Sequence, residues 1–117
     1  MGVNILVAED EAMIAMQIEM DLEDAGYTVV GPYMTLDACM GALETETIHA
    51  AVLDVDLADF NVFPFAFKLE ERGTPFVFHT GRGSHHKIQA KFPDASICTK
   101  PAEVTLLLRE LDLPVSI

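Results

Sequence analysis

Carboxylate side chains gather at two points of the sequence. Glu9, Asp10 and Glu11 follow the apolar run NILVA, and Asp54 and Asp56 lie just after the apolar run AAVL. If a fold brought these carboxylates to one edge of a sheet, they would repel one another unless a hard cation such as Mg²⁺ bound among them. The two clusters therefore predict a metal site, provided that the fold unites them.

Two further groups could act on a phosphoryl oxygen. Thr80 and Gly81 follow the run FVFH and offer a hydroxyl and an unobstructed backbone, while Lys100 follows SICT and offers an ammonium. Asp54 could then attack a phosphoryl group as the nucleophile, with Lys100 and the metal neutralising charge and Thr80 positioning one oxygen. A general base is unnecessary because a carboxylate is already ionised. The combination indicates phosphoryl-transfer chemistry.

The elements that must position these residues can be predicted from the alternation of short apolar runs with segments of helical period. We expect strands over residues 4–8, 28–31, 50–53, 75–79 and 96–99, and helices over residues 12–25, 36–46, 62–72, 84–91 and 102–111. This pattern favours an α/β class: a three-layer, doubly wound (βα)5 flavodoxin-like fold with a five-stranded parallel sheet in the order 2-1-3-4-5. In such a fold the residues that follow the strands converge at one edge.

Size and charge limit the possible functions. Of the 117 residues, 50% are hydrophobic and 22% are charged, so the chain can bury a core, and we expect a single domain over residues 1–117. Seven Lys and Arg against 19 Asp and Glu give a formal net charge of −12. This charge repels phosphate backbones and anionic lipids, which argues against nucleic-acid and membrane partners.

The two cysteines indicate the compartment. Cys39 and Cys98 form neither a CxxC pair nor a disulfide framework, which is typical of a reducing environment, and we expect both to be buried and unreactive. The first apolar run is too short to cross a membrane and lacks the basic lead of a signal peptide. The sequence therefore favours a cytoplasmic location.

Apolar side chains at helical spacing are expected in the core. The expected sets are Met13, Met16 and Met20; Phe60, Phe63 and Phe67; and Leu106, Leu107 and Leu111. The histidines show no metal-ligand spacing and have no Cys partner, so we expect them at the surface. They are His49, His79, His85 and His86.

From end to end, the chain resembles the receiver domain of two-component response regulators. The resemblance is carried by Glu9-Asp10 after NILVA, Asp54 in AVLDVD, Thr80 in FVFHTG and Lys100 in CTKPA, in that order. It implies that Asp54 is the phosphoacceptor, that Thr80 is the switch residue and that Lys100 assists phosphoryl transfer.

The resemblance also implies a cofactor and a backbone feature. Mg²⁺ would be bound by Glu9, Asp10, Asp54 and the main-chain carbonyl of Asp56. The bond between Lys100 and the following proline would be cis, as X-Pro bonds can be at small cost.

The chain departs from the family pattern at two places. Ile97 stands three positions before the lysine, where many receivers have an aromatic residue whose movement accompanies phosphorylation. Whether this chain signals phosphorylation in that way is therefore left open. Residues 57–61 contain neither the Pro nor the Gly that often follows the acceptor, so the shape of this loop is not predicted. We also hypothesise that Asp56 and Arg82 flank the site and form an ion pair.

The function implied by the resemblance is signalling. A histidine kinase or phosphotransfer protein would donate a phosphoryl group to Asp54, and the domain, with no output domain attached, would act on a downstream protein target as a monomer or weak homodimer. It would be a phosphoacceptor rather than an enzyme, catalysing at most its own phosphorylation and dephosphorylation.

Two alternatives belong to other functional classes. The DVD sequence at Asp54 and Asp56 also resembles the motif of haloacid-dehalogenase-like phosphatases, with a nucleophile followed by a general acid. The substitution at Ile97 is compatible with a receiver-like scaffold that binds partners without phosphorylation.

Overall fold

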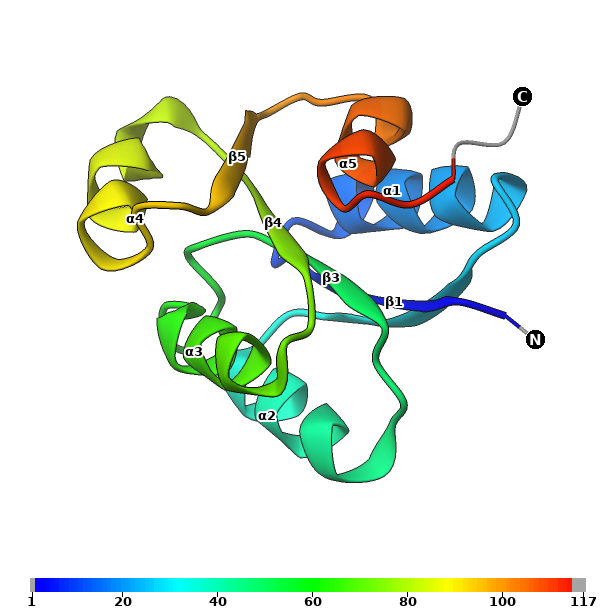
Figure 1. Ribbon diagram of the computed structural model, residues 1–117, viewed down its shortest axis with the longest axis horizontal. Helices are drawn as coiled ribbons and strands as arrows, with labels where there is room; N and C mark the ends of the chain where they lie inside the picture. Colours follow the sequence, from blue (N-terminus) through cyan, green and yellow to red (C-terminus); the bar gives the residue numbers. More distant parts are fainter. Residues whose placement is uncertain (1, 115–117) are drawn as a thin grey trace.

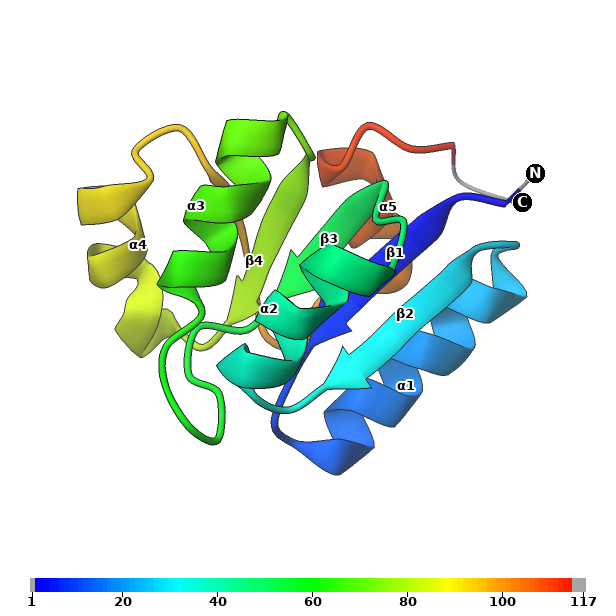
Figure 2. The ribbon, with the colours of Figure 1, turned by 90° about the horizontal axis from the view of Figure 1, so that it is seen from below.

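Five parallel strands form the central sheet of the protein. The computed structural model describes residues 2–114 and orders the strands β2-β1-β3-β4-β5, which confirms the predicted flavodoxin-like topology (Figures 1 and 2). The strands are β1 (Asn4–Ala8), β2 (Thr28–Tyr33), β3 (Ala50–Leu53), β4 (Phe76–Thr80) and β5 (Ser96–Thr99).

Five helices cover the two faces of this sheet. On one face lie α1 (Ala12–Asp24) and α5 (Val104–Glu110), and on the other lie α2 (Leu36–Thr45), α3 (Phe63–Arg72) and α4 (His85–Lys91), as Figure 1 shows. A single 3₁₀ turn, Arg82–Ser84, leads into α4. None of the helices between residues 2 and 114 has the length and apolar character needed to cross a bilayer.

Strand periodicity divides the core into two layers. Ile5 and Val7 of β1 pack toward α1 and α5, whereas Leu6 and Ala8 pack toward α2 and α3, because successive side chains on a strand point to opposite faces. All four residues of β3 are buried, as expected for a central strand covered on both faces. Cys39 and Cys98 are buried as free thiols, one in each layer.

The edge strand β2 carries an irregularity. Its register against β1 shifts between Leu6 and Ala8, next to a cis Gly31-Pro32 bond, and β2 continues to Tyr33 instead of ending at Gly31. Gly31 has a φ of +96°, and a Cβ there would lie 2.7 Å from the backbone nitrogen of Tyr33. Only glycine fits this backbone without strain.

The methionine prediction for α1 was wrong. Met13, Met16 and Met20 are 85%, 57% and 53% exposed, because α1 turns Ile18 and Leu22 toward the sheet. At about 100° per residue the methionines lie on the opposite side of the helix from Ile18. Two apolar sets repeat at helical spacing in this segment, and only one of them can face the core.

The phenylalanine set was also partly wrong. Phe63 is buried, but Phe60 and Phe67 are 57% and 42% exposed. Phe60 precedes α3, so it does not share the helical period, and the helix instead buries Phe65, which was not predicted to be in the core.

Two other placements differ from expectation. Leu106 is exposed because α5 turns the neighbouring Leu107 and Leu111 inward. His79 is only 3% exposed because it points from β4 toward the α1 and α5 layer, on the same strand face as Val77. His49 and His86 are exposed, as predicted, whereas His85 is intermediate.

Candidate functional site

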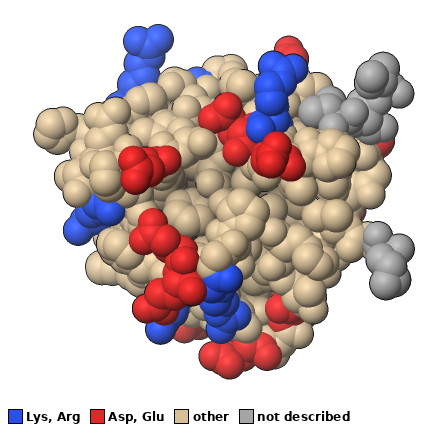
Figure 3. All heavy atoms as spheres, viewed as in Figure 1, with Lys and Arg blue, Asp and Glu red and all other residues tan. Residues whose placement is uncertain are grey.

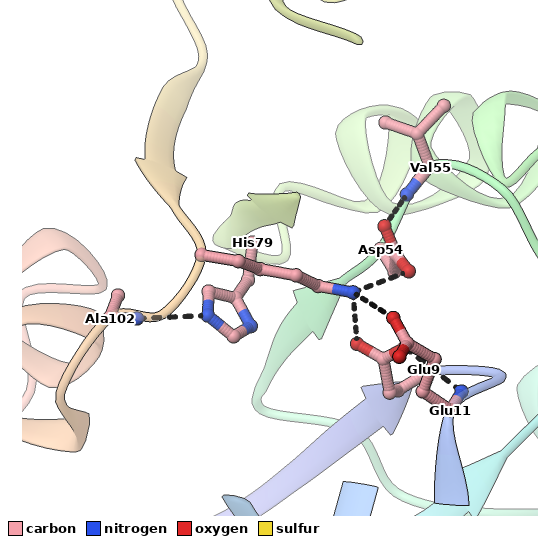
Figure 4. A network of polar contacts seen from close by, with 7 residues as sticks. Glu9, Glu11, Asp54, Val55, His79 and Ala102 are labelled. Carbon is pink, nitrogen blue, oxygen red and sulfur yellow. Dashed lines mark hydrogen bonds and ion pairs between the residues drawn. The ribbon is translucent and has the colours of Figure 1, made fainter. Parts of the chain in front are cut away.

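Residues from four strand ends meet at the carboxyl edge of the sheet. Glu9 follows β1, Asp54 follows β3, Thr80 ends β4 and Lys100 follows β5. The Lys100 Nζ lies 2.8 Å from Glu9 Oε1 and 2.9 Å from Asp54 Oδ2, and these contacts are drawn in Figure 4. Glu11 Oε1 is a more distant third neighbour, at 3.6 Å. The strand order thus unites groups that lie far apart in the sequence.

Asp54 is held rigidly. Its backbone N–H donates to Ala8 O at 2.9 Å, and its side-chain Oδ1 accepts a hydrogen bond from the N–H of Val55 at 2.8 Å. Because Oδ2 contacts Lys100, both carboxylate oxygens have a partner. The residue is 7% exposed. The structure therefore presents a buried carboxylate of fixed orientation, as a positioned nucleophile requires.

Three carboxylates form a compact acidic group. Oxygens of Glu9, Asp10 and Asp54 all lie within 4.8 Å of one another. Glu9 is 1% exposed, and its Oε2 accepts a hydrogen bond from the N–H of Glu11 at 3.0 Å. Oxygen ligands at this spacing fit a hard cation such as Mg²⁺, which also prefers carboxylates.

Burial changes the protonation of Glu9. Loss of solvation raises the pKa of this carboxyl to about 7, and the charge on Asp54 adds to the effect, while hydrogen bonding to Lys100 and Glu11 opposes it. The single ammonium of Lys100 therefore does not fully compensate the acidic group.

Lys100 is fixed by its backbone as well as by its ion pairs. Its N–H donates to Thr80 O at 2.9 Å, and the N–H of Ala102 donates to His79 Nε2 at 3.2 Å. The Lys100-Pro101 bond is cis, as predicted. Burial by itself lowers the pKa of Lys100, but hydrogen bonds to Asp54 and Glu9 outweigh it and raise that pKa above its usual value. The side chain thus remains a cation.

A cleft of about 470 Å³ opens over these groups. Its walls include Asp10, Asp54, Gly81 and Lys100. Thr80 is buried at the end of β4 and is not one of the lining residues, although the cleft begins at the next residue. The structure therefore places Asp10, Asp54 and Lys100 around an accessible space, with Thr80 at its margin.

The Asp56 side chain is not part of the three-carboxylate group, although Asp56 lines the same cleft. It is exposed and lies 3.7 Å from the Lys87 Nζ of α4. Between residues 2 and 114 no ion pair joins Asp56 to Arg82, so the hypothesised pair was wrong. The partner of Asp56 is instead Lys87 of α4, which lies five residues after Arg82 in the sequence.

Sequence reasoning missed two residues next to the site. His79 packs beneath the segment that carries Lys100. Its burial could have been predicted, because side chains alternate along a strand and His79 therefore lies on the same buried face of β4 as Val77. Asp59 accepts hydrogen bonds from the N–H groups of Leu36 and Asp37, at 2.7 and 3.2 Å, and thereby joins the loop after Asp54 to α2. No local pattern marks a contact between segments so far apart.

Figure 3 shows the surface charge on the face viewed in Figure 1. Acidic side chains are spread over several parts of this face, and the basic side chains form smaller, separate groups. This distribution agrees with the net charge of −12.

Comparison with known proteins identifies the family. No protein-family model and no curated protein sequence matches the chain. The chain is similar to the solution structure of SdrG from Sphingomonas melonis Fr1, with 36% identity, coverage of 96% of this chain and 98% of that chain, and a TM-score of 0.81. It is also similar to the BeF3-activated conformation of SdrG from Pseudomonas melonis Fr1, with 37% identity, coverage of 95% and 98%, and a TM-score of 0.76.

A CheY-like response regulator receiver domain protein from Methanospirillum hungatei JF-1 shares the fold. Its TM-score is 0.82 at 22% identity, with coverage of 96% of this chain and 92% of that chain. Three observations point to the same family: the fold, the similarity to SdrG along nearly the whole chain, and the order in the sequence of the acidic pair, Asp54, Thr80 and Lys100. The chain belongs to the receiver-domain family of two-component response regulators.

Proposed function

We propose that this receiver domain accepts a phosphoryl group on Asp54 from a histidine kinase or phosphotransfer protein and signals by binding a downstream protein. The observation that carries the proposal is the contact of Lys100 Nζ with Asp54 at 2.9 Å, beside the acidic group and under an open cleft. These are the groups that phosphoryl transfer to a carboxylate requires.

In the proposed reaction, an oxygen of Asp54 forms a bond to phosphorus as the phosphorus–nitrogen bond of the donor phosphohistidine breaks. The electron pair of that bond returns to the ring nitrogen, and the donor histidine leaves as a neutral imidazole because its other ring nitrogen carries a proton. Lys100 places its ammonium against the oxygens of the transferred group, and the Thr80 hydroxyl hydrogen-bonds one of them. The acyl phosphate on Asp54 is the product.

Glu9, Asp10, Asp54 and the main-chain carbonyl of Asp56 would hold Mg²⁺. When bound, this ion supplies positive charge that offsets the phosphoryl oxygens and the acidic group. Its binding requires ionised carboxylates, so Glu9 must release its proton.

The exposed methionine face of α1, formed by Met13, Met16 and Met20, is the surface we assign to the protein donor. Met13 also lines an apolar cavity of about 230 Å³ between α1 and α5, whose wall includes Lys100. A donor seated there would lie beside the site, and flexible thioethers adapt well to a partner. The charge of −12 favours a partner with basic groups.

The direct test is the intact mass of the purified protein after incubation with acetyl phosphate and Mg²⁺. We expect addition of one phosphoryl group to the wild type and to Asp94→Asn, a control at an exposed aspartate away from the site. Asp54→Asn and a wild-type sample with EDTA should gain none. Equal labelling of Asp54→Asn, or no labelling of the wild type with Mg²⁺, would contradict the proposal.

Two further assays separate the alternatives. A phosphatase related to the haloacid dehalogenases would turn over a small phosphomonoester, with Asp56 as general acid, but this side chain is exposed and paired with Lys87. A phosphorylation-independent scaffold would keep its partner binding in Asp54→Ala. Receiver domains are generally signalling domains, and we expect neither result.

A further inference from the structure

We propose that Asp59 is a positioning residue that ties the loop after Asp54 to the N-terminus of α2 and thereby couples the candidate phosphorylation site to that helix. The proposal rests on the proposed function, because it concerns the loop that presents the main-chain carbonyl of Asp56. It assigns a role to a side chain that lies outside the acidic group and outside the cleft.

The loop between β3 and α3 is closed on itself. Asp56 and Asn61 form an antiparallel bridge, and the N–H of Leu57 donates to Phe60 O at 3.1 Å. The base of the loop is closed by a hydrogen bond from the N–H of Val62 to the carbonyl of residue 55, at 2.8 Å. A displacement at the tip is therefore transmitted to Asp56, which stands at the start of the bridge.

The tip of this loop is attached to the segment before α2. Asp59 Oδ1 accepts from the N–H of Leu36 at 2.7 Å, and Oδ2 accepts from the N–H of Asp37 at 3.2 Å. Next to it, the N–H of Ala58 donates to Met34 O at 2.9 Å. Two hydrogen bonds to one carboxylate fix its orientation as well as its position, so the loop and the helix behave as one unit.

The electrostatics favour this attachment. The first N–H groups of a helix have no partner within the helix, and its N-terminus carries partial positive charge. Asp59 binds two of these groups of α2, and the hydrogen bond from Leu36 is the main reason that the pKa of Asp59 lies below its usual value. The carboxylate thus stays charged and bonded at neutral pH, although it is exposed.

Coupling through this contact is reciprocal. If Asp59 holds the loop in the shape that presents the Asp56 carbonyl, cation binding must in turn stabilise the contact between Asp59 and α2. Met34 and Phe60, which are 44% and 57% exposed, belong to the two segments that this contact joins. The state of the Asp54 site would therefore be felt at α2, a route that does not need an aromatic residue at position 97.

The test is a Mg²⁺ titration followed by backbone amide NMR of the full chain. In the wild type we expect the amides of Val55, Leu36 and Asp37 to shift with one common dissociation constant. In Asp59→Ala the amides of residues 36 and 37 should stop responding, and Mg²⁺ affinity at Val55 should fall roughly tenfold, as for other residues that orient a metal ligand. Asp59→Asn keeps one acceptor and should lie between the two.

The matched control is Asp37→Ala, which removes the same charge from the same helix end but keeps the N–H that donates to Asp59. It should change Mg²⁺ affinity little. Equal losses in Asp37→Ala and Asp59→Ala would reduce the effect to charge alone and overturn the proposal, as would an unchanged response of Leu36 in Asp59→Ala. No response of any wild-type amide to Mg²⁺ would instead refute the metal site of the proposed function, and the coupling proposal would fall with it.

Discussion

The buried carboxyl of Glu9 should make the metal-free protein less stable as the pH rises. Burial raises the pKa of Glu9 from an ordinary value of 4.5 to about 7. Between these values the folded protein keeps a proton that the unfolded chain has released, so the free energy of unfolding falls as the pH rises through this interval. Above about pH 7 the loss is complete.

The size of the effect follows from the same two values. The two pKa values correspond to a decrease in the free energy of unfolding of up to about 3 kcal/mol at neutral pH. This is a large part of the stability of a small domain. Glu9→Gln replaces the carboxyl by an uncharged group of similar shape and leaves Lys100 paired with Asp54. We expect this variant to match the wild type near pH 5 and to exceed its stability by up to about 3 kcal/mol near pH 8.

The assay is urea unfolding in EDTA at a constant ionic strength, followed by circular dichroism at several pH values between about 5 and 8. His79 acts in the opposite direction, because burial lowers its pKa and favours the folded state as the pH rises toward the ordinary value of 6.5. Since both proteins contain His79, its contribution cancels in their difference. As a control, Glu44→Gln changes an exposed carboxyl, and its free energy of unfolding should change with pH as that of the wild type does. If the difference in unfolding free energy between Glu9→Gln and the wild type stayed constant over this pH range, the reasoning would be refuted.

Three stability predictions can be measured by the same unfolding assay. Phe65→Ala should cost about 3–5 kcal/mol because the ring is fully buried, and a loss under about 1 kcal/mol would show that the core can close around the gap. Gly31→Ala combines a φ of +96° with a Cβ placed 2.7 Å from the Tyr33 nitrogen, so it should cost more than Gly26→Ala, which has the same φ but open space around it. Equal costs would mean that the close approach is unimportant. Thr35→Ala removes the side chain that caps α2 and should cost about 1 kcal/mol, with recovery in Thr35→Ser if the cap is the cause.

Much of the fold could be predicted from the sequence because strands and helices differ in period. The ranges for β1, β3 and β5 match the structure, and each α-helix was found within a few residues of its bounds. The face of α1 was not predictable in the same way, since Ile18 and Met16 belong to two equally regular apolar sets. Choosing between them requires knowing which side meets the sheet.

The meeting of Asp54, Lys100 and the acidic pair could be predicted because it depends only on strand order. Contacts made by side chains between loops could not. Asp56 pairs with Lys87 rather than Arg82, and Asp59 reaches the start of α2, both from the turn that the bridge between Asp56 and Asn61 closes. Such contacts depend on the local path of the backbone, which residues 57–61 do not specify by any Pro or Gly.

The two edges of the sheet bear on aggregation. An exposed edge strand offers free N–H and C=O groups to another chain, and long, flat edges promote intermolecular pairing. Here one edge is β2, where Pro32 lacks an N–H and the register shift breaks the regular ladder, and the other is β5, which has only four residues. The net charge of −12 adds mutual repulsion, so charge and edge structure both disfavour pairing of strands between copies of the chain.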